Sequence, residues 1–325
     1  MESLGNRVRA SVYRLWSGSP ALTAAGLLMI GVFAASIVGV LMDPRVITGA
    51  PAWLKPAKFA ISNAIYMLTL AWIFTHLPEW PRTRRSAGWV TAVVLVLEVV
   101  IIDTQAWRGT TSHFNLGTVL DTVLFAIMGL AIAVQTVASV AVAVALWRQH
   151  FDDRALGWAL RFGIVITIVG ASTGGLMTRP TTAQFEEARA TGRIVIAGAH
   201  TVGAPDGGPG LPVTGWSVQH GDVRIPHFIG LHAMQVLPLL ALALGRRRPQ
   251  TARVRMMLAA IASYAALFAI LLWQALRGQS LVQPDGVTIA AFIVWAILTG
   301  LGTWFAATRR ATTRNQAERS RAAIA

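Results

Sequence analysis

The chain has 325 residues, of which 54% are hydrophobic and only 13% are charged, and it contains no cysteine. The absence of cysteine excludes disulfides, zinc–thiolate sites, cysteine-ligated iron–sulfur clusters and thiol catalysis. Apolar runs of about 20 residues recur along the chain, which is typical of transmembrane helices. A water-soluble fold would have too little polar surface to cover such runs.

The net charge of +14 would suit nucleic acid, but the position of the charges argues against that partner. The arginines gather at the ends of apolar runs, where a basic excess sets the orientation of a membrane protein. We therefore interpret the charge as lipid-facing and topogenic. The lipid bilayer is the expected partner, and no nucleic acid is expected.

In chain order, the apolar pattern predicts eight spans. They cover residues 20–42, 57–76, 86–107, 116–147, 155–177, 224–245, 256–276 and 286–307. A basic amphipathic lead (1–19) precedes them and a basic tail (308–325) follows. The first run is too long for a cleavable signal peptide and has no small-residue cleavage site. The predicted fold class is an all-α integral membrane protein, a single domain (1–325) built as a bundle of about eight transmembrane helices.

An even number of spans places both termini on the same side of the membrane. That side carries roughly twice as many lysines and arginines as the other, so the positive-inside rule makes it cytoplasmic. We predict a bacterial cytoplasmic (inner) membrane protein with both termini in the cytoplasm.

The segment 178–223 is predicted to be a long extracytoplasmic loop between spans five and six. Thr181-x-x-Gln184 is a capping-box pattern and predicts a short helix over 183–190, ended by Gly192. The Gly- and Pro-rich stretch 200–212 predicts turns. Because loops of this length are functional or disordered, we expect this one to pack as a lid over the extracytoplasmic face.

Gly170-Ala-Ser-Thr-Gly174 in span five has the spacing of small residues that lets two helices approach closely. Close helix packing is the main interpretation of this pattern. A helix kink or a passage for a ligand is the alternative.

The stretch 221–235 carries the densest set of polar residues at a predicted membrane boundary: Asp222, Arg224, His227, His232 and Gln235. Such groups are costly in a bilayer unless they face a cavity, a partner or a ligand. The two histidines are five positions apart, so they point in different directions on a helix and do not form a two-histidine metal site by themselves. Hydrogen bonds to adjacent helices, metal or haem ligation, and proton transfer or substrate contact remain alternatives.

Span two carries Lys55, Lys58, Ser62, Tyr66 and Thr69 within one narrow arc. The two lysines could extend to lipid headgroups. Their shared stripe with the other polar side chains favours a wall that faces the bundle.

Three acids lie in or at the start of spans three and four: Glu98, Asp103 and Asp121. A carboxylate within the membrane is paired, neutral or a proton carrier. Arg108 and His113 lie between these spans. His113 either caps span four or faces the same cavity as His227.

Four motifs carry a family resemblance: Trp-Leu-Lys-Pro-x-Lys-Phe (53–59), Arg-Gly-x-x-Ser-His-Phe-Asn (108–115), Pro-Asp-Gly-Gly-Pro-Gly-Leu-Pro (205–212) and Pro-His-Phe-x-Gly-Leu-His-Ala (226–233). Together they resemble a group of uncharacterised bacterial polytopic membrane proteins, from which no activity transfers. The architecture is also similar in outline to haem A synthase. That family has histidine pairs in spans two, four, six and eight, and span eight of this chain has no histidine, so only the architecture is compared.

The leading functional hypothesis is a membrane-embedded enzyme, in particular a haem- or metal-dependent oxidoreductase with its site at the extracytoplasmic face. The candidate catalytic residues are Glu98, Asp103 and Asp121. The candidate ligands of a haem or a single metal ion are His113, His227 and His232. A small hydrophobic or anionic substrate would be bound by Lys55, Lys58, Tyr66, Arg108, Arg224 and Gln235.

Two hypotheses from other classes stay open. The first is a proton-coupled transporter, which the buried acids favour, although the two halves of the chain show no internal repeat. The second is a non-catalytic membrane subunit or assembly factor whose long loop docks a periplasmic partner.

Overall fold

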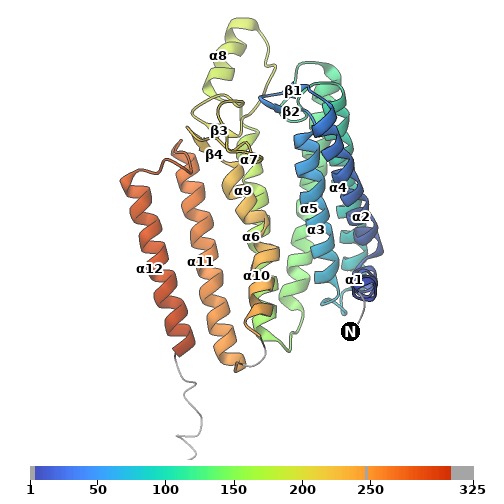
Figure 1. Ribbon diagram of the computed structural model, residues 1–325, viewed down its shortest axis with the longest axis vertical. Coiled ribbons are helices and arrows are strands. Elements are labelled where there is room, and N and C mark those ends of the chain that lie inside the picture. The colour runs from blue at the N-terminus through green and yellow to red at the C-terminus, as the bar shows by residue number, and fades with distance from the viewer. Residues whose placement is uncertain (1–3, 246–247, 309–325) are drawn as a thin grey trace, which may run out of the picture.

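The computed structural model describes residues 4–245 and 248–308, and its long helices stand side by side in an elongated bundle (Figure 1). The helices are α1 (Leu4–Gly18), α2 (Pro20–Met42), α3 (Leu54–Phe74), α4 (Pro81–Trp107), α5 (Val119–Arg148), α6 (Arg154–Ser172), α7 (Gly174–Met177), α8 (Thr182–Thr191), α9 (Arg224–Leu231), α10 (Ala233–Ala243), α11 (Gln250–Leu276) and α12 (Gly286–Thr308). Two antiparallel strand pairs, β1 (Val46–Ile47) with β2 (Ala50–Pro51) and β3 (Thr201–Val202) with β4 (Gly221–Asp222), lie at one end. We call this the loop end, and the end that carries α1 the opposite end.

Seven of the described helices are long and apolar enough to cross a membrane, and the bent pair α9–α10 brings the number to as many as eight. This helical, membrane-protein-like architecture agrees with the predicted bundle. The helix starts are set by local chemistry. Ser19 and Thr118 cap α2 and α5 because their side-chain oxygens accept the amides of Leu22 and Asp121. The predicted basic tail beyond Thr308, like Arg246 and Arg247, lies outside the described residues.

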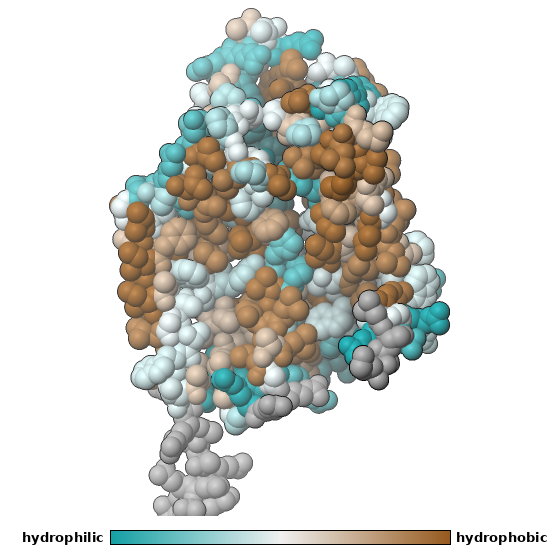
Figure 2. Space-filling view, viewed as in Figure 1, coloured by the Kyte–Doolittle hydropathy of each residue, from teal (hydrophilic) through white to brown (hydrophobic). Residues whose placement is uncertain are grey.

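Hydrophobic side chains both fill the interior and cover the outside of the bundle. One core cluster joins α2, α3, α4, α5, α6, α10 and α11, and it includes the fully buried Phe74, Leu160 and Met234. On the face drawn in Figure 2, brown hydrophobic surface forms a belt across the middle of the molecule. Helix α12 contributes only Thr288 and Ala306 to the buried residues, so most of its apolar side chains lie on the outside of the bundle.

Span six is broken, which the sequence did not predict: α9 and α10 meet at an angle of 45°. The break has a side-chain cause. The hydroxyl of Thr167 on α6 donates to the Leu231 carbonyl and accepts the Met234 amide, both at 3.2 Å. The Tyr264 hydroxyl donates to the Ile229 carbonyl at 2.5 Å. Side chains inserted into the backbone ladder in this way kink a helix while keeping its polar groups satisfied.

The small-residue pattern of span five does pack a helix closely, as predicted. A Cβ built on Gly170 would lie 2.5 Å from the Gly230 Cα, and one built on Gly230 would lie 2.4 Å from the Gly170 Cα. Only glycine fits on both sides of this contact. It presses α9 against α6 and thereby fixes the position of His227, three residues before Gly230.

The segment between α7 and α9 folds over the loop end of the bundle (Figure 1). Its helix α8 has the predicted capping box between Thr181 and Gln184, and it ends at Gly192 in the left-handed conformation. Backbone hydrogen bonds tie the segment to the α4–α5 loop: Leu116 N–H to Val195 O at 2.8 Å, and Ala197 N–H to Phe114 O at 2.9 Å. The segment therefore covers the residues that follow α4 and precede α5.

Candidate functional site

The start of α3 places two lysines below this cover. Lys55 Nζ lies 3.1 Å from His113 Nδ1 and 5.8 Å from the ring centre of Phe59. Lys58 Nζ donates to the Thr214 carbonyl at 3.1 Å. Both side chains are only partly exposed. The predicted stripe on α3 thus faces neighbouring elements, and each ammonium has a neutral hydrogen-bond partner.

His113 lies in the α4–α5 loop among aromatic rings. Its ring centre is 5.6 Å from that of Phe59, 6.0 Å from Phe114 and 6.4 Å from Phe125. Burial, followed by the positive charge of Lys55, holds the pKa of His113 well below its usual value, so the ring is neutral. Because an ammonium only donates, Nδ1 of His113 accepts from Lys55 and the ring proton is assigned to Nε2.

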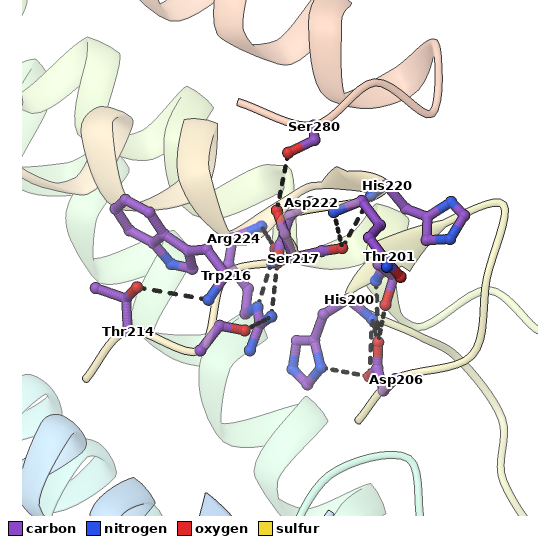
Figure 3. Close-up of polar contacts among 12 residues, drawn as sticks. His200, Thr201, Asp206, Thr214, Trp216, Ser217, His220, Asp222, Arg224 and Ser280 are labelled. Carbon is purple, nitrogen blue, oxygen red and sulfur yellow. Dashed lines mark hydrogen bonds and ion pairs between the residues drawn. The ribbon is translucent and has the colours of Figure 1, made fainter. Parts of the chain in front are cut away.

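His200 pairs with Asp206 in the segment that covers the loop end (Figure 3). His200 Nδ1 lies 2.5 Å from Asp206 Oδ2, and the carboxylate also accepts the backbone amides of His200 and Thr201 at 3.0 Å. The Thr201 hydroxyl is a further donor at 2.5 Å. Burial alone would raise the pKa of Asp206, but these donors hold it below its usual value. The Asp206 carboxylate therefore stays ionised.

Burial lowers the pKa of His200 in spite of its acidic partner. We therefore assign a neutral ring whose Nδ1–H donates to Asp206. The other ring nitrogen, Nε2, is then an unprotonated acceptor. A carboxylate that fixes the tautomer of a histidine in this way is the orienting arrangement found in general-base and metal-ligand histidines.

His227 on α9 is oriented by the carbonyl end of α6. Its Nδ1 lies 2.9 Å from Gly170 O, which can only accept, and 3.3 Å from Thr173 Oγ1. Nδ1 therefore carries the proton and Nε2 is again an acceptor. His113, His200 and His227 interact electrostatically with one another. We call these three histidines, with Lys55 and Asp206, the histidine cluster.

Arg224 and the fully buried Asp222 form a bidentate pair beside the histidine cluster (Figure 3). The Nε–Oδ1 distance is 2.9 Å and the Nη2–Oδ2 distance is 2.6 Å. Arg224 Nη2 also donates to the Gly215 carbonyl at 2.6 Å. Asp222 in turn accepts the Ser217 amide at 2.8 Å. This pair connects the start of α9 to the turn that precedes it.

Arg108 and Asp121, both predicted site residues, belong to a separate group. Arg108 Nη1 lies 2.6 Å from Asp121 Oδ1, and Gln105 Nε2 donates to the same oxygen at 2.8 Å. The Thr118 hydroxyl donates to the other oxygen at 2.7 Å. We call Gln105, Arg108, Thr118 and Asp121 the aspartate cluster. Because both oxygens of Asp121 are occupied, the cluster joins α4 to α5 and leaves no free acid.

The remaining predicted acids are less well paired. Glu98 is buried in α4 and interacts electrostatically with Lys55, which brings it into the surroundings of the histidine cluster. Asp103 is partly exposed, and its Oδ1 is buried with no hydrogen-bond partner among the described residues.

Three predicted residues lie deeper along the bundle. The Tyr66 hydroxyl is 3.4 Å from Ser139 Oγ, and Gln135 Nε2 donates to it at 3.4 Å. The His232 ring packs on Phe228 with 4.2 Å between ring centres. The amide group of Gln235 lies 3.4 Å from Thr69 Oγ1, whichever way the amide is turned. The structure therefore groups His113 with His227 but not with His232.

Hydrophilic surface interrupts the belt about halfway along the molecule (Figure 2). The partly exposed polar residues of the bundle include His232 and Gln235 at the α9–α10 break and Thr69 on α3, whose hydroxyl contacts Gln235. The polar groups of the bundle therefore continue some way below the loop end.

Sequence reasoning did not select His200 or Asp206 as site residues, and it named Asp222 only as a member of the polar stretch 221–235. The stretch 200–212 predicted only turns, and turns are what bring His200 back onto Asp206. A usable signal was present, since a histidine and an aspartate bracket a short glycine-containing turn, and the aspartate is the second residue of one of the four resemblance motifs.

Among the described residues, no group of three or more histidine, aspartate and glutamate side chains is arranged to hold a metal ion. Comparison of the chain with protein-family models, curated proteins and solved structures found no match. The fold and site define a helical, membrane-protein-like chain with a partly buried histidine cluster under a folded loop. Its function is inferred from that site alone.

Proposed function

We propose that this protein is a membrane-embedded enzyme that performs general acid–base chemistry at the loop end. In this proposal the protein spans a bacterial inner membrane and its loop end is extracytoplasmic. The site is the histidine cluster, which lies near the end of the hydrophobic belt. A substrate that is anchored in the membrane would reach it with its polar part.

One observation carries this proposal: two histidines present the same ring nitrogen, Nε2, in opposite protonation states. His113 accepts at Nδ1 and presents Nε2–H, whereas His200 donates at Nδ1 and presents an unprotonated Nε2. A neutral donor and a neutral acceptor in one partly buried site are what a proton transfer through the substrate requires. Histidines that only filled the core would have no need for a carboxylate partner.

The roles follow from the partners. His200, oriented by Asp206, takes a proton from water or from a substrate hydroxyl. His113 gives its Nε2 proton to the group that leaves while Lys55 passes an ammonium proton to Nδ1, so the ring stays neutral throughout the step. Lys55 also draws negative charge toward the site.

A comparison of metabolites tests the proposal and needs no assumption about which substrate is used. Membranes of cells that produce the wild-type protein, His200→Ala or Gln219→Ala would be analysed by untargeted mass spectrometry. Gln219 is the matched control because it is exposed in the same loop and bonds Ser217 only through its backbone. We expect one class of molecule to be consumed with the wild type and with Gln219→Ala.

His200→Ala should slow that conversion about 100-fold or more, which is the usual contribution of a general base. The variant must first elute from size exclusion like the wild type, so that loss of folding is excluded. If the wild type and His200→Ala give the same profile, the proposal is wrong.

A further inference from the structure

An excess of positive charge lies next to the histidine cluster. Lys55, Lys58 and Arg224 interact electrostatically with one another. Of these three cations, only Arg224 has a carboxylate of a described residue within ion-pair distance, the buried Asp222. Nearby Asp206 is occupied by His200 and Thr201. Gathering like charges in a partly buried place costs free energy, and the cost is recovered when an anion binds between them.

Backbone carbonyls currently occupy these donors. Residues 209–218 form a hairpin in which Leu211 N–H donates to Trp216 O at 2.8 Å and Val218 N–H donates to Pro209 O at 3.1 Å. Its turn offers two consecutive carbonyls: Thr214 O accepts from Lys58 and Gly215 O accepts from Arg224. Both acceptors are neutral. An ionised oxygen in their place would add the attraction between opposite charges, which a carbonyl does not offer.

We propose that Lys55, Lys58 and Arg224 form a binding site for the phosphate headgroup of an anionic amphiphile. Without a ligand, the hairpin carbonyls of Thr214 and Gly215 accept the hydrogen bonds of Lys58 and Arg224 in its place. The inference rests on the proposed function, since it names the substrate class of the same site. Binding would transfer Lys58 and Arg224 from the hairpin to the headgroup.

Charge and position both select this ligand. The two lysines without a carboxylate partner at ion-pair distance match a phosphate monoester, which carries a charge of about −1.5 to −2 at neutral pH. The planar guanidinium of Arg224 suits phosphate oxygens, and its Nη1 makes no hydrogen bond to a described residue. The site lies where α3 and α9 begin, near the upper limit of the hydrophobic belt (Figure 2). An acyl chain would lie along that belt while the headgroup is bound.

Calorimetric titration of the full-length protein in detergent micelles tests this inference. The probes are dihexanoyl phosphatidic acid, inorganic phosphate and dihexanoyl phosphatidylcholine. We expect the phosphatidic acid to bind at least 10-fold more tightly than either of the others. Equal affinity for inorganic phosphate would overturn the amphiphile as the ligand. Equal affinity for the phosphatidylcholine would overturn the phosphate monoester.

The variant Lys58→Gln should weaken phosphatidic acid binding about 10-fold or more, and Lys58→Arg should restore most of it. Arg179→Gln is the matched control, because Arg179 is an exposed cation in the segment that covers the loop end. If Lys58→Gln binds as the wild type does, the site is not where we place it. Retention of binding by Lys58→Arg excludes misfolding as the cause of the loss.

One further variant separates this inference from the proposed function. His200→Ala should bind the phosphatidic acid within about twofold of wild type, because His200 is not among the headgroup donors. If the protein binds the phosphatidic acid but shows no turnover, the headgroup site is retained and the proposed enzyme is rejected. If turnover is unaffected by Lys58→Gln, the enzyme is retained and the headgroup site is rejected.

Discussion

Two polar clusters lie at the loop end, and they differ in how their hydrogen-bonding atoms are used. In the aspartate cluster, donors from Gln105, Arg108 and Thr118 occupy both oxygens of Asp121. In the histidine cluster, each ring bonds a protein partner through Nδ1, and its Nε2 makes no hydrogen bond to a described residue. Similar residue types therefore build a joint between helices in one place and a candidate site in the other.

The difference shows that burial of a charged group does not by itself indicate function. A carboxylate whose two oxygens both accept hydrogen bonds from the protein needs no ligand. A ring that is oriented through one nitrogen and has no protein partner at the other can still bind a ligand or exchange a proton there. Substitutions in each cluster can test whether the two really divide into a structural and a functional one.

The largest effect on stability is expected for Asp121→Asn. Asparagine is neutral, so even with its amide oxygen turned toward Gln105 and Arg108 it would leave Arg108 without its buried carboxylate partner. Removal of one partner of a buried pair costs about 3–5 kcal/mol, and we expect about 3 kcal/mol because Arg108 keeps some access to solvent. Equilibrium unfolding in mixed detergent micelles measures this loss.

Asp285→Asn is the matched control for that variant. The Arg277–Asp285 pair has the same distance of 2.6 Å, but its side chains are 35% and 41% exposed. Exposed pairs contribute less than about 1 kcal/mol. Equal losses for Asp121→Asn and Asp285→Asn would mean that the aspartate cluster does not hold α4 against α5.

A smaller effect is expected from acidification, and it should come from the histidine cluster. Burial lowers the pKa of His113 and His200 in the folded protein, while the unfolded chain has a value of about 6.5. Above pH 6.5 both states are neutral and stability does not change. Below pH 6.5 the two rings take up protons in the unfolded chain but stay neutral in the folded protein. Stability should then fall by up to about 1.4 kcal/mol per pH unit for each ring.

The measurement is unfolding of the wild type and His113→Gln at pH 7.5 and 5.5. The variant should lose part of the acid sensitivity, because Gln cannot be protonated. His150→Gln serves as the control, since its ring is 85% exposed and solvated in both states. Neighbouring Asp206 does not produce this window, because its lowered pKa places its own contribution at more acidic pH. An unchanged slope in His113→Gln would contradict the prediction.

Periodicity and residue type predicted most of the fold. The apolar runs predicted the long helices, and Thr181 with Gln184 predicted the cap of α8, because both signals are local. The break of span six was missed since its cause is Thr167 on another helix. Pro238 lies after the break and does not indicate its position. A kink caused by a side chain of a neighbouring helix cannot be recognised in the sequence of the helix that bends.

The candidate site was predictable only in part, for a related reason. Helical spacing predicted that Lys55 and Lys58 share one stripe of α3. Arg224 and His227 were selected as site residues because polar groups at a membrane boundary cost free energy unless they have a partner. The number of hydrogen bonds that Asp121 accepts could not be predicted, because Gln105 and Arg108 reach it only after α4 and α5 have packed. His200 was missed because a turn-rich loop has no period from which contacts follow.

The smallest effect is expected for Tyr66→Phe, which tests how far the site extends down α3. Tyr66 was a predicted substrate-binding residue, but it lies eight positions after Lys58, a rise of about 12 Å along a helix. A phosphate held by Lys58 cannot also reach its hydroxyl. Its contacts with Ser139 and Gln135 are long, at 3.4 Å, and each contributes at most about 1 kcal/mol. We expect Tyr66→Phe to change phosphatidic acid affinity less than twofold and unfolding free energy by about 1 kcal/mol or less. A 10-fold loss of affinity in the same titration used for Lys58→Gln would show that the ligand reaches the middle of the bundle, and the headgroup would then have to be larger than a phosphate monoester.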